Sequence, residues 1–173
     1  MDETSASEIR ALDDERDSLE ALTELLHAAY AELKTLGFRY KAVDQSVDVT
    51  RDRIARGECY VALQNGVLVG TAMLNLPGRH YPGSDWYQRP DVAVLSQFAV
   101  EPRLQRRGWG SKLILHLEAR ARELGAAELA IDTAEGATHL IALYERRGYR
   151  HVGFAQWPHT NYRSVVLSKR LGD

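Results

Sequence analysis

A short glycine-containing turn in the second half of the chain carries the residues best suited to chemistry. Gly108 and Gly110 flank Trp109, after a strand-like run and at the start of a helical pattern. Free N–H groups and the positive end of the helix dipole favour an anion there, and glycines let it approach the backbone. Three arginines that suit phosphate recognition precede the turn: Arg103, Arg106 and Arg107. The turn therefore predicts a phosphate-binding site.

The spacing of this turn differs from two common nucleotide sites. It lacks the GxxxxGK[ST] pattern of a Walker A loop, and Lys112 and Leu113 stand where a Rossmann fingerprint needs its third glycine. A nucleotide-binding protein that uses the turn in another way stays open as an alternative. A second alternative is that the turn is only a tight helix start and that its arginines are solvated.

The elements around the turn are predicted from hydrophobic periodicity. Strand-like runs in the second half cover residues 92–100, 128–132, 149–154 and 162–169. Helical patterns cover residues 109–124 and 138–147. Thr138 offers a capping hydroxyl to the second helix, and Gly148 follows its end. Strands and helices in this order predict a mixed sheet with helices packed on it.

The first half has a similar mixture of elements. Helical patterns cover residues 18–36 and 46–56, and strand-like runs cover residues 8–12, 59–63 and 67–76. Asn65 and Gly66 between the last two runs accept positive φ, which predicts a hairpin. Residues 77–90 are rich in Pro, Gly and aromatic side chains, which indicates a long, functional loop.

Length and composition favour one ordinary domain. The 173 residues suit a single unit, with residues 1–91 as its N-terminal half and residues 92–173 as its ligand-binding half. The net charge of −2 gives no general attraction to nucleic acid or membrane. The polar N-terminus does not resemble a signal peptide, so we expect a cytoplasmic protein. Cys59 is the only cysteine, expected in a buried strand, and no spacing of His and Cys indicates a metal.

Two motifs together resemble the GCN5-related N-acetyltransferase (GNAT) superfamily. Residues 105–110, QRRGWG, fit the Q/R-x-x-G-x-G/A signature that opens a helix after a strand. Residues 140–149, LIALYERRGY, are similar to the family's A-I-x-L-Y-x-x-x-G-F/Y segment. The resemblance implies an α/β (α+β) acyl-CoA N-acyltransferase fold, with a mixed, largely antiparallel sheet of about seven strands and about four helices.

The resemblance also implies acetyl-CoA as co-substrate, bound by the 92–173 half in an opening between the 92–100 and 128–132 strands, with the acceptor side in the 1–91 half. It further assigns the contacts of acetyl-CoA. Backbone groups of residues Phe98, Ala99 and Val100 would bond the pantetheine arm. Backbone N–H groups of the turn would hold the pyrophosphate: Gln105, Arg106, Arg107, Gly108, Trp109, Gly110 and Ser111. Many family members carry Asn where this chain has Ala137, so Thr138 or His139 would have to replace that contact.

Tyr144 would lie near the thioester sulfur and donate a proton to the departing thiolate. A phenol, with its pKa near ~10, is protonated at neutral pH and suits this role. The alternative is that Tyr144 is a core residue of an amphipathic helix, beside Leu140 and Leu143. The motif favours the first interpretation.

The acceptor is expected to be a primary amine of a small molecule or peptide, attacking directly without a covalent enzyme intermediate. Aromatic and polar residues in two loops would shape its pocket: His80, Trp86, Tyr87, Trp157 and His159. Trp86 and Trp157 alternatively cover the sheet, and no residue stands out as the general base. Asp85, Asp132 and Glu135 could attract a cationic amine.

Two further features stay open. The same fold could serve as a non-catalytic acyl-CoA sensor, which the missing base permits and Tyr144 argues against. A homodimer is possible, although no segment marks an interface.

Overall fold

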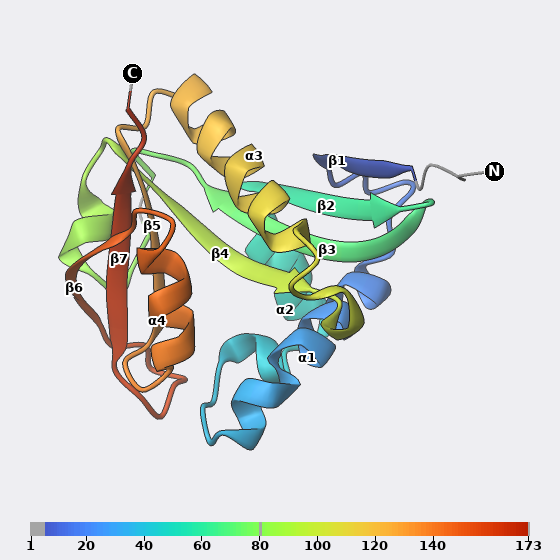
Figure 1. The fold of residues 1–173 in the computed structure, drawn as a ribbon, viewed down its shortest axis with the longest axis horizontal. Coiled ribbons are helices and arrows are strands. Elements are labelled where there is room, and N and C mark those ends of the chain that lie inside the picture. The colour runs from blue at the N-terminus through green and yellow to red at the C-terminus, as the bar shows by residue number, and fades with distance from the viewer. Residues whose placement is uncertain (1–5, 80, 173) are drawn as a thin grey trace.

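The computed structural model describes residues 6–79 and 81–172, whose strands form one open seven-stranded sheet in the order β1-β2-β3-β4-β5-β7-β6 (Figure 1). The strands are β1 (Ser7–Ala11), β2 (Glu58–Gln64), β3 (Val67–Asn75), β4 (Val92–Val100), β5 (Glu128–Ala134), β6 (Arg150–Ala155) and β7 (Ser164–Arg170). The α-helices are α1 (Leu19–Thr35), α2 (Val47–Ile54), α3 (Trp109–Glu123) and α4 (Thr138–Glu145). Every neighbouring pair is antiparallel except β4 with β5, which confirms the expected fold class.

The helices begin close to the predicted residues. Ser18 caps α1 by accepting a hydrogen bond from the Ala21 N–H, and Ser46 caps α2 in the same way. The expectation that Thr138 caps α4 is wrong, because Ala137 holds the cap position without a side-chain bond and Thr138 is already helical. None of the described helices is long and apolar enough to cross a membrane.

The predicted hairpin is confirmed, and the predicted loop is only partly a loop. Asn65 has φ 51° and Gly66 has φ 78°, both on the left-handed side that the two-residue turn requires. Within residues 77–90, Asp85–Gln88 form a 3-10 helix, η2, capped by Ser84. Two more 3-10 turns, η1 (Lys41–Val43) and η3 (Pro102–Leu104), were also not predicted, since elements this short show no hydrophobic period.

The sheet has two covered faces, and β4 contributes to both. Ala93 and Leu95 pack in the core cluster under α3, whereas Val92 and Val94 pack with Tyr87 on the opposite face. This alternation is that of a strand buried on both sides. Figure 1 shows α3 and α4 on the near side of the sheet and α2 behind β4.

The one parallel pair is also the shortest. Strands β4 and β5 pair only from Val92 to Val94 on one side and from Glu128 to Ala130 on the other. Beyond this point β4 stays with β3, and β5 stays with β7 as far as Ala134. The two strands diverge in Figure 1, which agrees with the expected opening between them.

The α3 helix offers a direct test of this packing. Leu117 on its inner face is fully buried (0% exposed), whereas Leu115, two residues away, is 61% exposed. We expect Leu117→Ala to lower the free energy of unfolding by about 2–5 kcal/mol, because it leaves a cavity. Leu115→Ala, the control, should change it by less than about 0.5 kcal/mol. Urea unfolding followed by circular dichroism measures both; equal effects would contradict this orientation of α3.

Candidate active site

A bulge near the end of β4 shapes one side of the opening. Thr71 of β3 pairs with Ala99, but Met73 pairs with Ser96, so β4 holds one extra residue there. Gln97 takes up this residue with φ 48°, a left-handed conformation rare for side chains other than glycine. Its buried side chain accepts a hydrogen bond from Gln45 Nε2 (2.9 Å), which holds the bulge in place.

After the bulge, the backbone of β4 presents its outer edge to the opening. The Glu101 N–H donates to the Val69 carbonyl (2.8 Å) and so faces β3. Because backbone groups alternate in direction along a strand, those of Phe98 and Val100 face away from β3. The Phe98 carbonyl accepts from Tyr30 Oη (3.1 Å), and the Val100 carbonyl accepts from Gln105 Nε2 (3.2 Å). The edge of β4 where pantetheine is expected therefore faces the opening, and its Phe98 and Val100 carbonyls are already held by side chains of this chain.

The turn before α3 has the backbone of an anion site. Arg106 has φ 64°, and Gly108, at the cap of α3, has φ 90°. The Lys112 N–H makes the first bond of the helix, to the Gly108 carbonyl, so the three N–H groups of residues 109–111 have no helical acceptor. Successive free N–H groups at a helix start form a concavity suited to phosphate.

The two glycines of the turn are needed for different reasons. A Cβ on Gly108 would meet nothing within 4 Å, so this glycine is required for its positive φ alone. A Cβ on Gly110 would lie 3.1 Å from Phe98 Cζ, so this glycine lets α3 approach the bulged end of β4. The sequence suggested that these glycines leave room for a phosphate, and the structure adds these two conformational and packing reasons.

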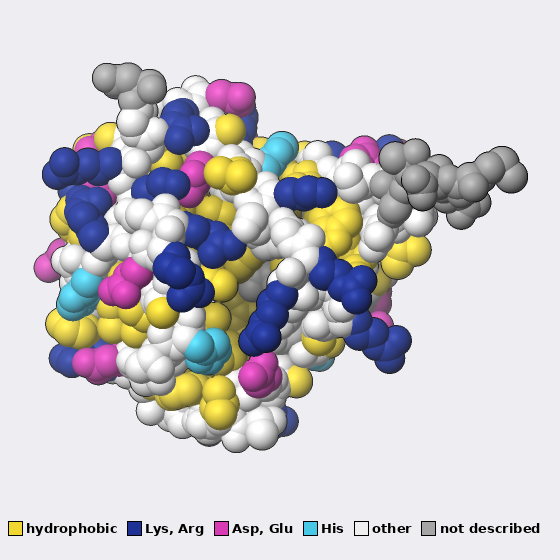
Figure 2. All heavy atoms as spheres, viewed as in Figure 1, with side chains coloured by type: hydrophobic (Ala, Val, Ile, Leu, Met, Phe, Trp, Pro, Cys, Tyr) yellow, Lys and Arg dark blue, Asp and Glu magenta, His cyan; other side chains and the backbone are white. Residues whose placement is uncertain are grey.

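Arg147, just after α4, joins the turn to the second motif. Its Nη2 donates to Ser111 Oγ (2.6 Å), and its Nη1 donates to the Leu143 carbonyl (3.2 Å). Trp109 is buried in the core, with Lys112 Nζ 4.9 Å from its ring centre, while Arg106 and Arg107 are exposed. Figure 2 shows Lys and Arg side chains bordering a hollow between the α4 side and the α1 side of this face.

Tyr144 of α4 is buried, and its ring meets that of Tyr149 edge-on at 5.8 Å between centroids. Its hydroxyl has no hydrogen-bond partner among the described residues. Burial raises the pKa of Tyr144, and the nearby hydroxyls of Tyr30 and Tyr40 raise this pKa further. The phenol therefore stays protonated at neutral pH, as a proton donor must.

A cavity of about 140 Å³ lies between the separated strands. β4 and β5 contribute Leu95, Ser96, Gln97, Phe98, Ile131 and Asp132 to its wall. Other segments contribute Tyr30, Tyr40, Lys41, Ala42, Arg53, Arg56, Tyr81, Pro82, Trp157, His159, Thr160 and Tyr162. The wall thus combines aromatic surface with a few polar groups, as in sites for small molecules.

The residues expected to bind the acceptor fall into three groups. Trp157 and His159 line the cavity. Tyr87 is buried behind the cavity and donates to Asp132 Oδ1 (2.6 Å). Trp86 packs on the sheet, with the Arg89 guanidinium 4.3 Å from its ring centre. Neither Tyr87 nor Trp86 belongs to the cavity wall. His80 lies outside the described residues.

The two expected loops do meet beside the cavity. A Cβ on Gly83, which has φ 106°, would lie 2.5 Å from the Trp157 ring, so the backbone of the 77–90 segment rests on this indole. The rings of Tyr81 and Trp157 are 5.8 Å apart. The two loops therefore form one aromatic wall.

Two tyrosines that sequence reasoning missed bridge the wide end of the opening. Tyr30 Oη bonds the Phe98 carbonyl of β4, and Tyr40 Oη accepts from the Ala134 N–H of β5 (2.9 Å). Their rings are 5.4 Å apart, and Tyr162 stacks on Tyr40 at 4.9 Å. The only signal for Tyr30 was its place in the apolar stripe of the first helix, which indicates a core residue rather than a site residue.

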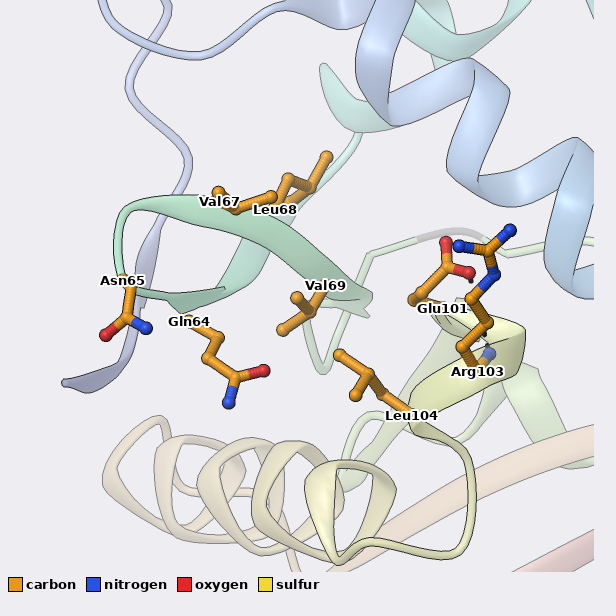
Figure 3. A pocket seen from close by; sticks show the side chains of 8 residues that line it. All are labelled: Gln64, Asn65, Val67, Leu68, Val69, Glu101, Arg103 and Leu104. Atoms are coloured by element: carbon orange, nitrogen blue, oxygen red, sulfur yellow. Dashed lines mark hydrogen bonds between the residues drawn. The ribbon is translucent and has the colours of Figure 1, made fainter. Parts of the chain in front are cut away.

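A second, larger hollow of about 680 Å³ lies at the β2–β3 hairpin beside η3 and is open to solvent (Figure 3). The β2–β3 hairpin and η3 line it with Gln64, Asn65, Val67, Leu68, Val69, Glu101, Arg103 and Leu104. Figure 3 shows Val69 and Leu104 facing one another, with Glu101 and Arg103 at one end. It includes neither Tyr144 nor the free N–H groups of α3, so size alone does not make it the active site.

Cys59 is buried in β2, as expected. Burial raises the pKa of its thiol to about 11, and Thr71 Oγ1 lies 3.6 Å from its sulfur. A thiol in this state is protonated at neutral pH and is a poor nucleophile.

A bulged strand that leaves its neighbour, a helix start with free N–H groups beside it and a buried phenol are the features that the sequence resemblance leads one to expect of an acyl-CoA-dependent acyltransferase. The sequence pattern of the Acetyltransferase (GNAT) family matches residues 19–149, and the chain belongs to this family. It is an acetyl-CoA-dependent N-acetyltransferase, which decides against the sensor and nucleotide-binding alternatives.

The chain is similar to several known proteins. It is 33% identical over 141 residues to S-(2-succino)cysteine N-acetyltransferase of Bacillus subtilis (strain 168), covering 80% of this chain and 82% of the relative. Its fold is similar to the ribosomal-protein-S18-alanine N-acetyltransferase of Escherichia coli, with TM-score 0.72, 20% identity and coverage of 97% and 96%. A Bacillus subtilis acetyltransferase in complex with CoA matches with TM-score 0.68, 22% identity and coverage of 95% and 99%.

The conformational role of Gly108 leads to a testable expectation. Gly108→Ala should lower the free energy of unfolding by about 1–2 kcal/mol, although its new methyl group touches nothing, because an L residue resists positive φ. Gly153→Ala in β6 is the matched control, since its Cβ also meets nothing within 4 Å but its φ is ordinary. It should be neutral or stabilise slightly. Equal unfolding midpoints for the two variants would show that the φ of Gly108 is not required.

Proposed function

We propose that this enzyme transfers the acetyl group of acetyl-CoA directly to a primary amine of a small molecule or peptide. One observation carries the proposal: the opening between β4 and β5 has a helix start with free N–H groups on one side and a cavity with aromatic and polar walls on the other. A thioester held along β4 would meet an amine from the cavity there. The acceptor half of the site is then formed by loops from both halves of the chain.

The donor side of the site fits a long, doubly anionic ligand arm. We assign the pyrophosphate to the backbone N–H groups of residues 105–111, of which the last three are free of helical bonds. We assign the pantetheine to the outward backbone edge of Phe98, Ala99 and Val100, where it would add a strand-like partner. Arg147 on Ser111 would add a positive charge near the phosphates.

Acetyl-CoA supplies the thioester. The amine nitrogen bonds to the carbonyl carbon, the carbon–sulfur bond breaks, and Tyr144 Oη provides the proton that the sulfur takes up. His159 is suited to take the proton that the amine loses. Burial, with Lys41 and Arg53 nearby, lowers the pKa of its imidazole, so the imidazole is neutral at pH 7. Cys59 takes no part, because it is buried in β2 and protonated.

Replacement of Tyr144 tests the proton-donor role. Tyr144→Phe should lower kcat by ~10–10³-fold and leave the Kd of acetyl-CoA nearly unchanged, because it removes only one hydroxyl. Tyr149→Phe is the control, since Tyr149 is also buried and its hydroxyl donates to Glu118 (3.1 Å) within the core. This variant should lose stability but keep kcat. Unchanged turnover in Tyr144→Phe, measured by thiol release, would remove Tyr144 from the mechanism.

His159 is tested in the same assay. His159→Gln should lower kcat by about 10²-fold at pH 7, because no other neutral imidazole lines the described cavity. His151→Gln on β6 is the control, since His151 is exposed, bonds only its own strand and lies outside the cavity wall. If both variants keep full activity, the amine loses its proton to another group.

A further inference from the structure

The described wall of the acceptor cavity has an excess of positive charge. Lys41, Arg53 and Arg56 belong to it, and Asp132 is its one carboxylate. None of the three cations forms an ion pair with any residue that the structure describes. A cluster of like charges around a cavity is unfavourable without a ligand of the opposite sign.

Asp132 is bonded on both oxygens, and by uncharged groups. Its Oδ1 accepts from Tyr87 Oη (2.6 Å), and its Oδ2 accepts from Trp157 Nε1 (2.8 Å). Glu135, the next carboxylate along the chain, pairs with Arg163 instead (2.7 Å). The structure therefore gives no support to the expectation that these carboxylates attract a cationic amine.

Arg53 is held at the cavity by a neutral partner. Its Nη1 donates to Gln45 Oε1 (2.7 Å), and Gln45 is itself buried, with Nε2 bonded to Thr50 Oγ1 (2.7 Å) and to Gln97 Oε1 of the bulge. The guanidinium is thus fixed relative to the end of β4, where the thioester is proposed to lie. An amide oxygen occupies one of its five N–H donors and leaves its charge uncompensated.

The surroundings of Arg53 and Lys41 disfavour their charged forms. Burial lowers the pKa of Arg53, and Arg56 lowers it further. Burial also lowers the pKa of Lys41, with Arg53 and Arg56 adding to this effect. Asp132 opposes the pKa shift of Arg53 and Asp52 opposes that of Lys41, but burial is the largest cause of both shifts. Groups with perturbed pKa values beside a cavity cluster at functional sites.

We propose that the acceptor is an amine that also bears a carboxylate, and that Arg53 binds this carboxylate with Lys41 and Arg56 alongside. The inference rests on the acetyl transfer proposed above and adds the substrate class. The planar fork of a guanidinium matches a carboxylate, whereas the cluster repels polyamines and aminoglycosides. The same cations would lower the pKa of the bound amine and so increase its neutral, nucleophilic fraction.

A panel of amines tests the class through thiol release at saturating acetyl-CoA. It pairs L-methionine and L-leucine with their amides, which carry no carboxylate, and it adds L-aspartate, L-glutamate, O-phosphoethanolamine, spermidine and short peptides with an amidated C-terminus. We expect the highest kcat/KM on carboxylate-bearing amines. Conversion of the carboxylate to an amide should raise the KM of the wild type about 10- to 100-fold.

Arg53→Gln should remove most of this difference. Its KM for the acid should rise about 10- to 100-fold, with kcat and the KM for acetyl-CoA nearly unchanged. Arg53→Lys keeps the positive charge without the planar guanidinium, so its KM for the acid should lie between those of the wild type and of Arg53→Gln. Arg51→Gln, on the same helix, is the control, because Arg51 is exposed and pairs with Asp48, and it should behave as the wild type.

The results separate two kinds of failure. Acetylation mainly of spermidine, of the amidated peptides or of O-phosphoethanolamine would overturn the proposed carboxylate, and so would an acid-to-amide difference that persists in Arg53→Gln. If no amine of the panel is acetylated, the proposed transfer itself fails and this inference falls with it. Thermal unfolding checks whether Arg53→Gln folds. If it does not, the same comparison of acid and amide is made with Arg53→Lys and Lys41→Gln. An acid-to-amide difference that stays unchanged in these two variants would likewise overturn the proposal.

Discussion

Strands β4 and β5 share three residue pairs before they separate, and the free backbone edges that this leaves determine the rest of the site. Unpaired backbone groups at the inner side of a sheet are costly without partners. The chain satisfies some of them with the hydroxyls of Tyr30 and Tyr40 and with the amide of Gln105. We propose that the rest bond a ligand that pairs like a strand.

The bulge of β4 connects both halves of the proposed reaction. On the donor side it brings Phe98 against Gly110, which sets the distance between β4 and the anion-binding start of α3. On the acceptor side Gln97 holds Gln45, and Gln45 holds the Arg53 guanidinium. A strained residue with φ 48° thus positions groups on two sides of the same opening, as is common at functional sites.

The elements that carry the proposed donor half could be predicted from sequence because its residues are local. The turn at residues 105–111 and the helix with Tyr144 each lie within one short motif, and both expected helices are present. The acceptor half could not, because its wall draws on segments from Tyr30 to Tyr162. Tyr30 lies in the apolar stripe of the first predicted helix, and nothing in the sequence marked Arg53 as a site residue. Trp86 looked like a site residue but covers the sheet, since composition does not tell which way a loop side chain turns.

Backbone hydrogen exchange with and without CoA tests the central claim, that the ligand binds along β4 and at the start of α3. Slower exchange upon CoA addition is predicted at Val100 and at residues 109–111, whose N–H groups lack partners within their own elements. No change is predicted at residues 64–69 beside the larger hollow. Protection at residues 64–69 and 103–104 instead, with none at the start of α3, would contradict the account.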